Sequence, residues 1–185
     1  MLESFGIDRK IKNLFIADSK NYWFLTDDNT FFFYDISRNE LRTVEPGRSA
    51  GQYGILYELA QYKNLYWIMY SSGLLRCWDS SSEEFVLHNE HFAGKITEAS
   101  NRLFICPTAA GDLWIMHNNG VSFYDWINKS WKEVAGIDGP SNFFTCMDLD
   151  ADENAWLGTS WSGLRKIDSR THQIETFDRM KLGCC

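Results

Sequence analysis

The sequence predicts an all-β protein: a β-propeller of four four-stranded blades that forms a partial ring or one half of a larger ring. The first observation is a fourfold repeat in the 185 residues, because a tryptophan inside a short apolar stretch recurs every 42 to 47 residues. An aspartate follows each tryptophan after 11 or 12 residues. The tryptophans are Trp23, Trp67, Trp114 and Trp156, and the aspartates are Asp35, Asp79, Asp125 and Asp168. Repeats of this length are typical of propeller blades.

The second observation is the strand pattern inside each repeat. In the last repeat, short apolar stretches at 143–149, 155–159, 163–168 and 173–177 alternate with turn-forming residues, and we name these expected strands a to d. Aromatic and β-branched residues at this spacing, without helical periodicity, predict strands. The other repeats follow the same pattern. We therefore expect blades at 11–47, 54–92, 97–138 and 143–178.

Each tryptophan is expected in strand b, packed between neighbouring blades as a large apolar plug. The segment Leu2–Asp8 resembles Lys132–Asp138, which is the end of an expected strand d. Residues 1–8 are therefore expected to form an orphan strand d. It would be either the remnant of a preceding blade or a strand that pairs with the far end of the ring.

Four blades are few for a closed propeller, so an isolated set of four would expose two apolar blade faces. We expect such a chain to associate, either as a homo-oligomer in which two chains make one eight-bladed ring or with the remaining blades of a longer receptor.

Charge and composition exclude several classes of function. The net charge of −7 and the absence of any basic run argue against nucleic-acid binding. No stretch approaches the roughly 20 apolar residues that cross a bilayer, and the first residues lack the pattern of a signal peptide. The five cysteines have no paired spacing, so no zinc site or other metal or cofactor site is expected. Three of them, Cys77, Cys106 and Cys146, fall in apolar strands and are expected to be buried.

One repeat carries a family resemblance. Residues Asn154–Asp168 read N-A-W-L-G-T-S-W-S-G-L-R-K-I-D and resemble the two-component regulator propeller repeat, roughly N-x-W-x-G-T-x-x-x-G-L-x-x-x-D. The other repeats match in outline, and the Gly-Thr pair is lost in the repeats that begin at Asn21 and Leu65. The resemblance implies a periplasmic, non-enzymatic module of a membrane-bound hybrid two-component receptor. Such modules sense ligands that include polysaccharide breakdown products.

Candidate ligand-binding residues come from the turns. In a propeller, the b–c and d–a turns share one face, where ligands usually bind near the central channel. The polar or aromatic residues expected there are Asp28, Asn29, His117, Asn118, Asn119 and Trp161. An exposed indole among amide side chains is typical of an oligosaccharide-binding surface. The alternative is that Trp161 packs on a neighbouring loop.

Other functions are weaker alternatives. The acidic run Asp148–Asn154 resembles a calcium loop but lacks the glycine and the bidentate glutamate that an EF-hand needs, so it is expected to be the a–b turn. The first functional alternative is a protein-interaction propeller. The second is an enzyme resembling the streptogramin lyases, which implies an acid-base role for His117, but the chain lacks clustered carboxylates next to it in sequence.

Overall fold

Four antiparallel sheets make up the described part of the chain, which covers residues 2–16, 20–28, 30–45, 53–54, 56–96, 103–117, 120–136 and 143–177 of this computed structural model. Each sheet has four strands, and strands that follow one another in the chain are neighbours in the sheet. The all-β class and the four four-stranded blades predicted from the sequence are confirmed.

One sheet lies within each predicted blade range. The first sheet contains β1 (Ile11–Ile16), β2 (Asn21–Thr26), β3 (Phe31–Asp35) and β4 (Glu40–Glu45). The second contains β5 (Leu56–Tyr62), β6 (Leu65–Tyr70), β7 (Leu75–Asp79) and β8 (Glu84–Asn89). The third contains β9 (Phe104–Pro107), β10 (Leu113–His117), β11 (Gly120–Asp125) and β12 (Ser130–Gly136). The fourth contains β13 (Phe144–Leu149), β14 (Ala155–Thr159), β15 (Leu164–Ile167) and β16 (Ile174–Phe177).

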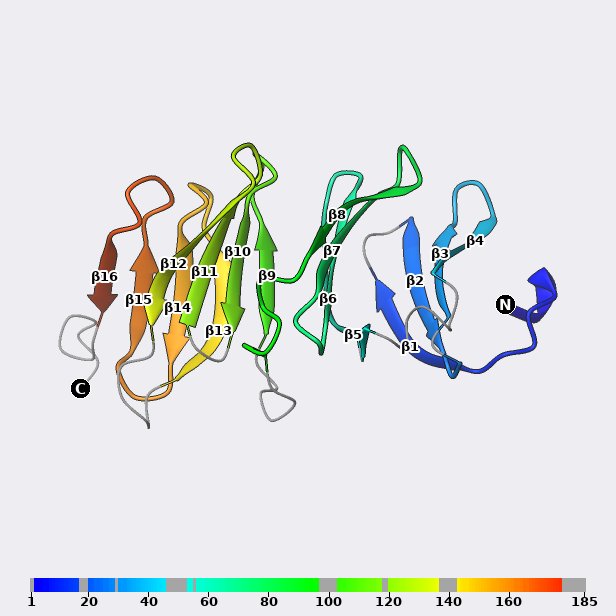
Figure 1. The fold of residues 1–185 in the computed structure, drawn as a ribbon, viewed down its shortest axis with the longest axis horizontal. Helices are drawn as coiled ribbons and strands as arrows, with labels where there is room; N and C mark the ends of the chain where they lie inside the picture. The colour runs from blue at the N-terminus through cyan, green and yellow to red at the C-terminus, as the bar shows by residue number, and fades with distance from the viewer. Residues whose placement is uncertain are drawn as a thin grey trace.

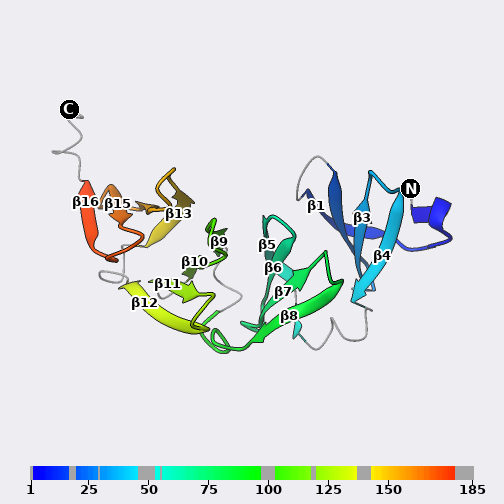
Figure 2. The same ribbon diagram turned by 90° about the horizontal axis from the view of Figure 1, so that it is seen from above.

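The sheets stand side by side along an open arc (Figures 1 and 2). Seen from above, the first strand of each sheet lies toward the concave side and the last strand toward the outside (Figure 2). β9 contacts both β5 and β13, so the first strands of the second, third and fourth sheets are neighbours. This arrangement is that of a partial propeller.

The repeated aspartate shapes the turn between the third and fourth strands of each sheet. Asp35 Oδ1 accepts a hydrogen bond from the backbone N–H of Arg38 at 3.1 Å, and Asp168 Oδ1 accepts one from Thr171 at 2.7 Å. Asp125 Oδ1 accepts the equivalent bond from Asn128, and Asp79 Oδ1 accepts one from Ser81, two residues on. The residue four positions after each aspartate has a positive φ of 52° to 60°; these residues are Asn39, Glu83, Lys129 and His172. The aspartate thus satisfies the N–H groups of a tight hairpin turn.

The tryptophans of the second strands fill the junctions between sheets. Trp23, Trp67 and Trp114 are 0% exposed, and each belongs to a different hydrophobic cluster shared by two neighbouring sheets. Each indole meets a ring of the next sheet; the partners, by distance between ring centroids, are Tyr66 at 4.9 Å, Trp126 at 5.2 Å and His172 at 5.5 Å. These three tryptophans therefore act as the plugs that the sequence predicts.

The fourth tryptophan has a different environment. Its neighbours Ala155 and Leu157 pack toward the third sheet, so Trp156, between them on the strand, faces outward and is half-buried. Its Nε1 donates a hydrogen bond to Asp150 Oδ2 at 2.8 Å, and its ring stacks on Phe177 at 5.3 Å. Asp150 also accepts bonds from two N–H groups of its own turn. The acidic run is accordingly held together by its own hydrogen bonds.

The cysteines do not share one environment. Cys77 is buried, and burial raises the pKa of its thiol to about 12. Burial likewise raises the pKa of the half-buried Cys106 to about 11. Cys146 is exposed, so the expectation of a buried side chain is wrong there. The reason is its position opposite Gly158 on the outward face of the fourth sheet.

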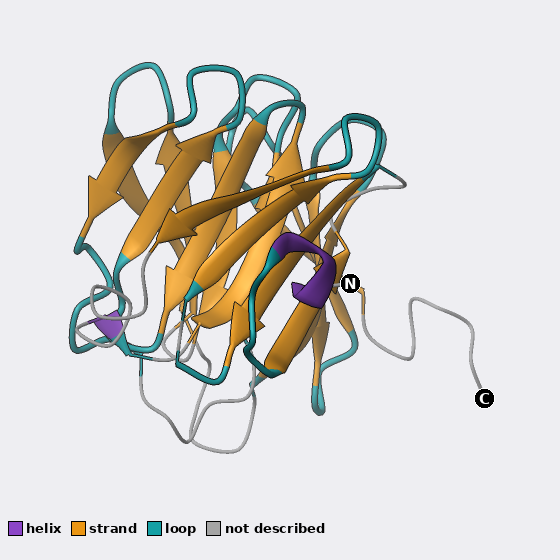
Figure 3. Ribbon diagram, turned by 90° about the vertical axis from the view of Figure 1, so that its right-hand side faces the viewer, coloured by secondary structure: helices purple, strands orange, loops and turns teal. Residues whose placement is uncertain are grey.

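The N-terminal segment also differs from the expectation. Residues 1–8 were predicted as an orphan strand d, but Leu2–Phe5 form the 3-10 helix η1. η1 lies in front of the first sheet when the molecule is viewed from its N-terminal side (Figure 3). The Phe5 ring packs edge-on against Tyr34 with a centroid separation of 5.7 Å. A strand needs a partner edge, and this segment instead packs a side chain on the outward face of the first sheet.

Replacing a junction tryptophan by alanine is expected to destabilise the fold far more than replacing the outward one. Trp114→Ala removes a fully buried indole and should cost about 3–5 kcal/mol of unfolding free energy. Trp156→Ala should cost about 1–2 kcal/mol because that ring is half-exposed. Urea unfolding followed by circular dichroism at low protein concentration measures both. Equal losses for the two variants would contradict the role given to the junctions.

Candidate functional site

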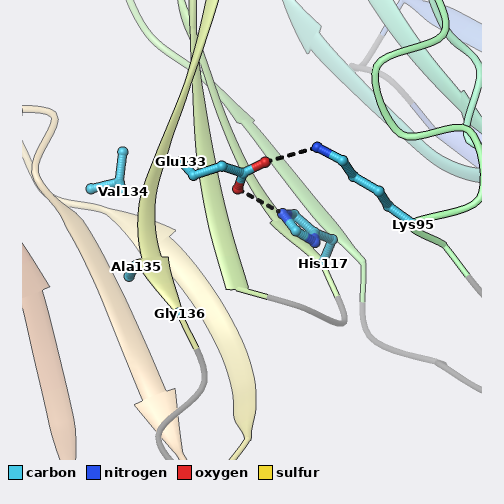
Figure 4. A pocket seen from close by; sticks show the side chains of 6 residues that line it. All are labelled: Lys95, His117, Glu133, Val134, Ala135 and Gly136. Carbon is cyan, nitrogen blue, oxygen red and sulfur yellow. Dashed lines mark hydrogen bonds and ion pairs between the residues drawn. The ribbon is translucent and has the colours of Figure 1, made fainter.

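A cluster of polar side chains lies where the second and third sheets meet, at the end that carries the b–c turns and d–a connections (Figure 4). His117 is the last residue of β10, before the turn to β11. His91 and Lys95 belong to the connection that follows β8. Ser122 lies on β11 and Glu133 on β12. We call these five residues the junction cluster.

One oxygen of Glu133 binds the buried side of the cluster. The Ser122 hydroxyl donates a hydrogen bond to Glu133 Oε2 at 2.6 Å. His117 Nε2 lies 2.9 Å from Ser122 Oγ and 3.5 Å from Glu133 Oε2. Because the serine proton is directed at the carboxylate, we assign the proton of the imidazole to Nε2, which donates to Ser122 Oγ. Only 1% of the His117 side chain is exposed, so it forms the floor of the site.

The second oxygen binds the exposed side. Lys95 Nζ donates to Glu133 Oε1 at 3.0 Å, and His91 Nε2 lies 3.3 Å from the same oxygen. The His91 ring stacks on Trp131 with centroids 4.7 Å apart and planes 9° apart. Glu133 thus ties the connection after the second sheet to the third sheet.

Burial and the neighbouring charges determine the protonation of the cluster. Burial opposes the ionisation of Glu133, but hydrogen bonds from Ser122 and Lys95 and the nearby histidines outweigh it and lower its pKa to about 2. Burial lowers the pKa of His117 and of His91, while Glu133 opposes both shifts. At neutral pH the cluster therefore holds one carboxylate, one ammonium group and two neutral imidazoles.

An open pocket of about 340 Å³ lies over this cluster. It is lined by Lys95, His117, Glu133, Val134, Ala135 and Gly136. Lys95 supplies N–H donors and Glu133 supplies carboxylate acceptors at its surface. Such a set can hydrogen-bond the hydroxyl groups of a polar ligand. In the described residues, no group of three or more His, Cys, Asp or Glu side chains is arranged to hold a metal ion.

A second pocket of about 400 Å³ is also lined by residues of the connection after β8. Its lining residues are Tyr53, Ser72, Leu74, Glu90 and Ala93. Ser72 belongs to the b–c turn of the second sheet and Ala93 to the d–a connection. The turn face therefore carries two pockets that share the segment 90–95 as a wall.

The sequence-predicted site residues lie on three different sheets. His117 lies in the junction cluster. Asp28, in the first sheet, pairs with Arg9 at 3.1 Å and accepts a hydrogen bond from Thr26 at 2.7 Å, which lowers its pKa. Trp161, in the fourth sheet, is 80% exposed, so it does not pack on a neighbouring loop. Asn29, Asn118 and Asn119 lie outside the described residues.

The turn that carries Trp161 is well bonded despite the exposure of the indole. The backbone N–H of Ser160 donates to the carbonyl of Phe143 at 2.9 Å. The Thr159 hydroxyl donates to the carbonyl of Gly163 at 2.8 Å and accepts from the N–H of Ser162 at 2.9 Å. An aromatic ring presented on such a turn is pre-organised for contact with a ligand or a partner.

Sequence reasoning missed Lys95, Ser122 and Glu133. On an ideal strand d, Glu133 would read as a solvent-facing residue. The register of β11 and β12 shifts between Val121 and Ser122, however, and this irregularity brings Ser122 opposite Glu133. The bulge has no sequence signal strong enough to predict it. The available signal was a serine and a glutamate near the predicted His117.

Acidification is expected to destabilise the fold through this cluster. The lowered histidine pKa values contribute stability above about pH 6.5, which is lost as the pH falls below it. The lowered pKa of Glu133 contributes stability above its ordinary value of 4.5, which is lost as the pH falls toward about 2. Glu133→Gln should cost about 1 kcal/mol at pH 7, a value reduced by the half-exposure of the side chain.

Urea midpoints of the wild type and Glu133→Gln, measured from pH 7 to pH 2.5, test this expectation. The difference between the two proteins should shrink as the pH falls from 4.5 toward about 2, because the glutamate of the unfolded chain takes up a proton there while that of the folded protein stays ionised. The exposed Glu84→Gln serves as the matched control and should leave the profile unchanged. A Glu133→Gln difference that stays constant with pH would rule out an ionised glutamate at the centre of the cluster.

The sequence matches no protein-family model and no curated protein. Solved structures do match the fold. The extracellular domain of the protein assigned as the hybrid two component system BT3049 from B. thetaiotaomicron superposes with a TM-score of 0.57 at 13% identity, over 91% of this chain and 22% of that one. The extracellular domain of BT4673 from the same organism gives a TM-score of 0.57 at 13% identity, over 91% and 24%.

A third match is PorZ, a surface component of the type-IX secretion system of Porphyromonas gingivalis, with a TM-score of 0.62 at 9% identity, over 94% of this chain and 23% of that one. The chain therefore spans less than a quarter of each of these proteins. The neighbours include extracellular domains of two-component systems, the class to which the repeat sequence points. At these identities the similarity establishes the fold, that of a β-propeller segment.

Proposed function

We propose that the chain is a non-catalytic, ligand-sensing propeller module of a two-component-type signalling receptor, and that it binds oligosaccharide on its turn face. The observation that carries the proposal is the pocket over the junction cluster, where Lys95 and Glu133 offer donors and acceptors at the meeting point of two sheets. Sugar hydroxyls are both donors and acceptors, so a paired ammonium and carboxylate suit them.

The structural neighbours support a sensory role, since two of them are extracellular domains of two-component systems. The proposal includes a periplasmic location for this chain, which is supported by the extracellular position of those two domains. No helix in the described part of the chain has the length and apolar character to cross a bilayer.

A signal could arise because the site joins two sheets. Lys95 and His91 follow the second sheet, whereas Glu133 belongs to the third. A ligand that replaces part of the Glu133 pairing would alter how the two sheets are held together. It would signal only to the extent that it binds one arrangement more tightly than the other.

A protein-interaction propeller is the second candidate. Three large apolar side chains near the same end of the fourth sheet are exposed: Trp161 at 80%, Phe143 at 39% and Leu164 at 39%. The lyase-like alternative has less support because the His117 side chain is 1% exposed and bonded to Ser122, so a substrate has little access to it.

Binding tests separate these candidates. A glycan array should identify an oligosaccharide, and calorimetry with that compound should show a Kd at least about tenfold weaker for Lys95→Met and for Trp161→Ala. Lys129→Met is the matched control, because Lys129 lies over the Trp126 ring at the c–d turn. Unchanged affinity in both site variants would refute the placement of the site, and a wild type that binds no glycan would favour the protein-interaction candidate.

A further inference from the structure

The first strands of the four sheets contain equivalent residues. In each sheet, one residue of the first strand pairs with the residue that follows the strand-b tryptophan. These residues are Leu14, Leu59, Ile105 and Met147. In the second, third and fourth sheets, this residue packs into the cluster that contains the tryptophan of the preceding sheet. Ile105 and Met147 are only 7% and 5% exposed, whereas Leu14 is 52% exposed. On the same outward face, its pair partner Phe24 and the adjacent Phe32 are 3% exposed, so Leu14 is the open part of that face.

The opposite half of a junction is exposed at the other end of the arc. Each sheet has an equivalent residue in its third strand, paired with the position two after the tryptophan: Phe31, Leu75, Val121 and Leu164. The first three are at most 1% exposed, whereas Leu164 is 39% exposed. Trp156, on the same face, is half-buried, and Cys146 is exposed.

The two ends therefore carry exposed equivalents, Leu14 and Leu164, of residues that are buried at the junctions. At three junctions within the chain, the face of one sheet that carries its strand-b tryptophan packs on the facing side of the next sheet, which includes residues of that sheet's first strand. A hydrophobic cluster fills each of these junctions. We propose that the outward face of the fourth sheet of one copy packs on the outward face of the first sheet of a second copy. Two such contacts would close two chains into one ring of eight sheets.

The arc is compatible with this partner, and η1 covers part of the first-sheet face. The sheets curve with their first strands toward one open side, as a half ring would (Figure 2). η1 leaves Leu14 on β1 exposed, but its Phe5 packs on Tyr34, the equivalent of the Trp78 that receives Trp23 at the first junction. The second copy must therefore displace Phe5 to pack on the whole face. Eight sheets lie within the usual range for propellers, and a head-to-tail contact that closes after two copies gives a finite assembly.

Light scattering after size exclusion tests the assembly. The wild type should have twice the 21.5 kDa chain mass. Leu14→Glu and Leu164→Glu should each be monomers, since either change places a charge in both contacts. Ile127→Glu, at an 81% exposed turn position, is the matched control and should remain a dimer. Circular dichroism confirms that each variant is folded.

Mixing the two monomeric variants tests the head-to-tail geometry. Leu14→Glu has an intact fourth-sheet face and Leu164→Glu has an intact first-sheet face, so one of the two contacts is restored in the mixed pair. Association should appear only on mixing, and weaker than in the wild type. A monomeric wild type, a dimer unaffected by Leu14→Glu, or an open-ended polymer would each overturn the proposal.

A cysteine pair tests the contact directly. Cys146 is equivalent to Phe104, since they pair with Gly158 and Met116, two positions after their tryptophans. Phe104 packs in the same cluster as Met147, the equivalent of Leu14. Leu14→Cys should therefore cross-link to Cys146 of the second copy with a short bismaleimide, and Cys146→Ser should abolish the product. A dimer that shows no such cross-link would also contradict the proposed contact.

Discussion

Face-to-face packing of neighbouring sheets around the strand-b tryptophans is the interaction on which the rest of this structure depends. Trp23, Trp67 and Trp114 are completely buried, and among the described residues their Nε1 atoms have no hydrogen-bond acceptor. Their contribution is therefore apolar burial and ring contact, which must exceed the cost of three unpaired N–H groups. The outward Trp156 has instead an acceptor in Asp150, as suits an indole next to solvent.

The junction cluster is a consequence of that packing. Once the second and third sheets are stacked, the connection after β8 crosses the end of the third sheet, and His91 and Lys95 reach Glu133. The carboxylate is shared between elements of both sheets, so its hydrogen bonds report their relative position. A polar site at a junction is consequently more sensitive to small movements of the sheets than a site within one sheet would be.

The local features of the fold were predictable from the sequence because each repeat carries its own signals: a tryptophan for the junction and an aspartate for the hairpin turn. Features that depend on partners were not. The sequence of segment 1–8 resembles that of a strand d. A strand also needs a neighbouring strand to pair with, and sequence similarity does not supply one, so η1 forms instead. His117 was predicted on the correct face. The place of Glu133 opposite Ser122 depends on a bulge, and no residue pattern in the sequence predicts that bulge. Cys146 is exposed because it lies on the outward face of the fourth sheet, which none of the described sheets covers.

The sequential order of strands within each sheet has a consequence for how the chain folds. Every strand pair in the described residues joins consecutive strands, so a sheet requires contacts over a few tens of residues at most. Each sheet then needs only its predecessor as a template, and the free-energy gain of each step comes from one junction. During synthesis the sheets can therefore form in the order in which they leave the ribosome. At each stage the newest sheet keeps one apolar face exposed until the following sheet packs on it.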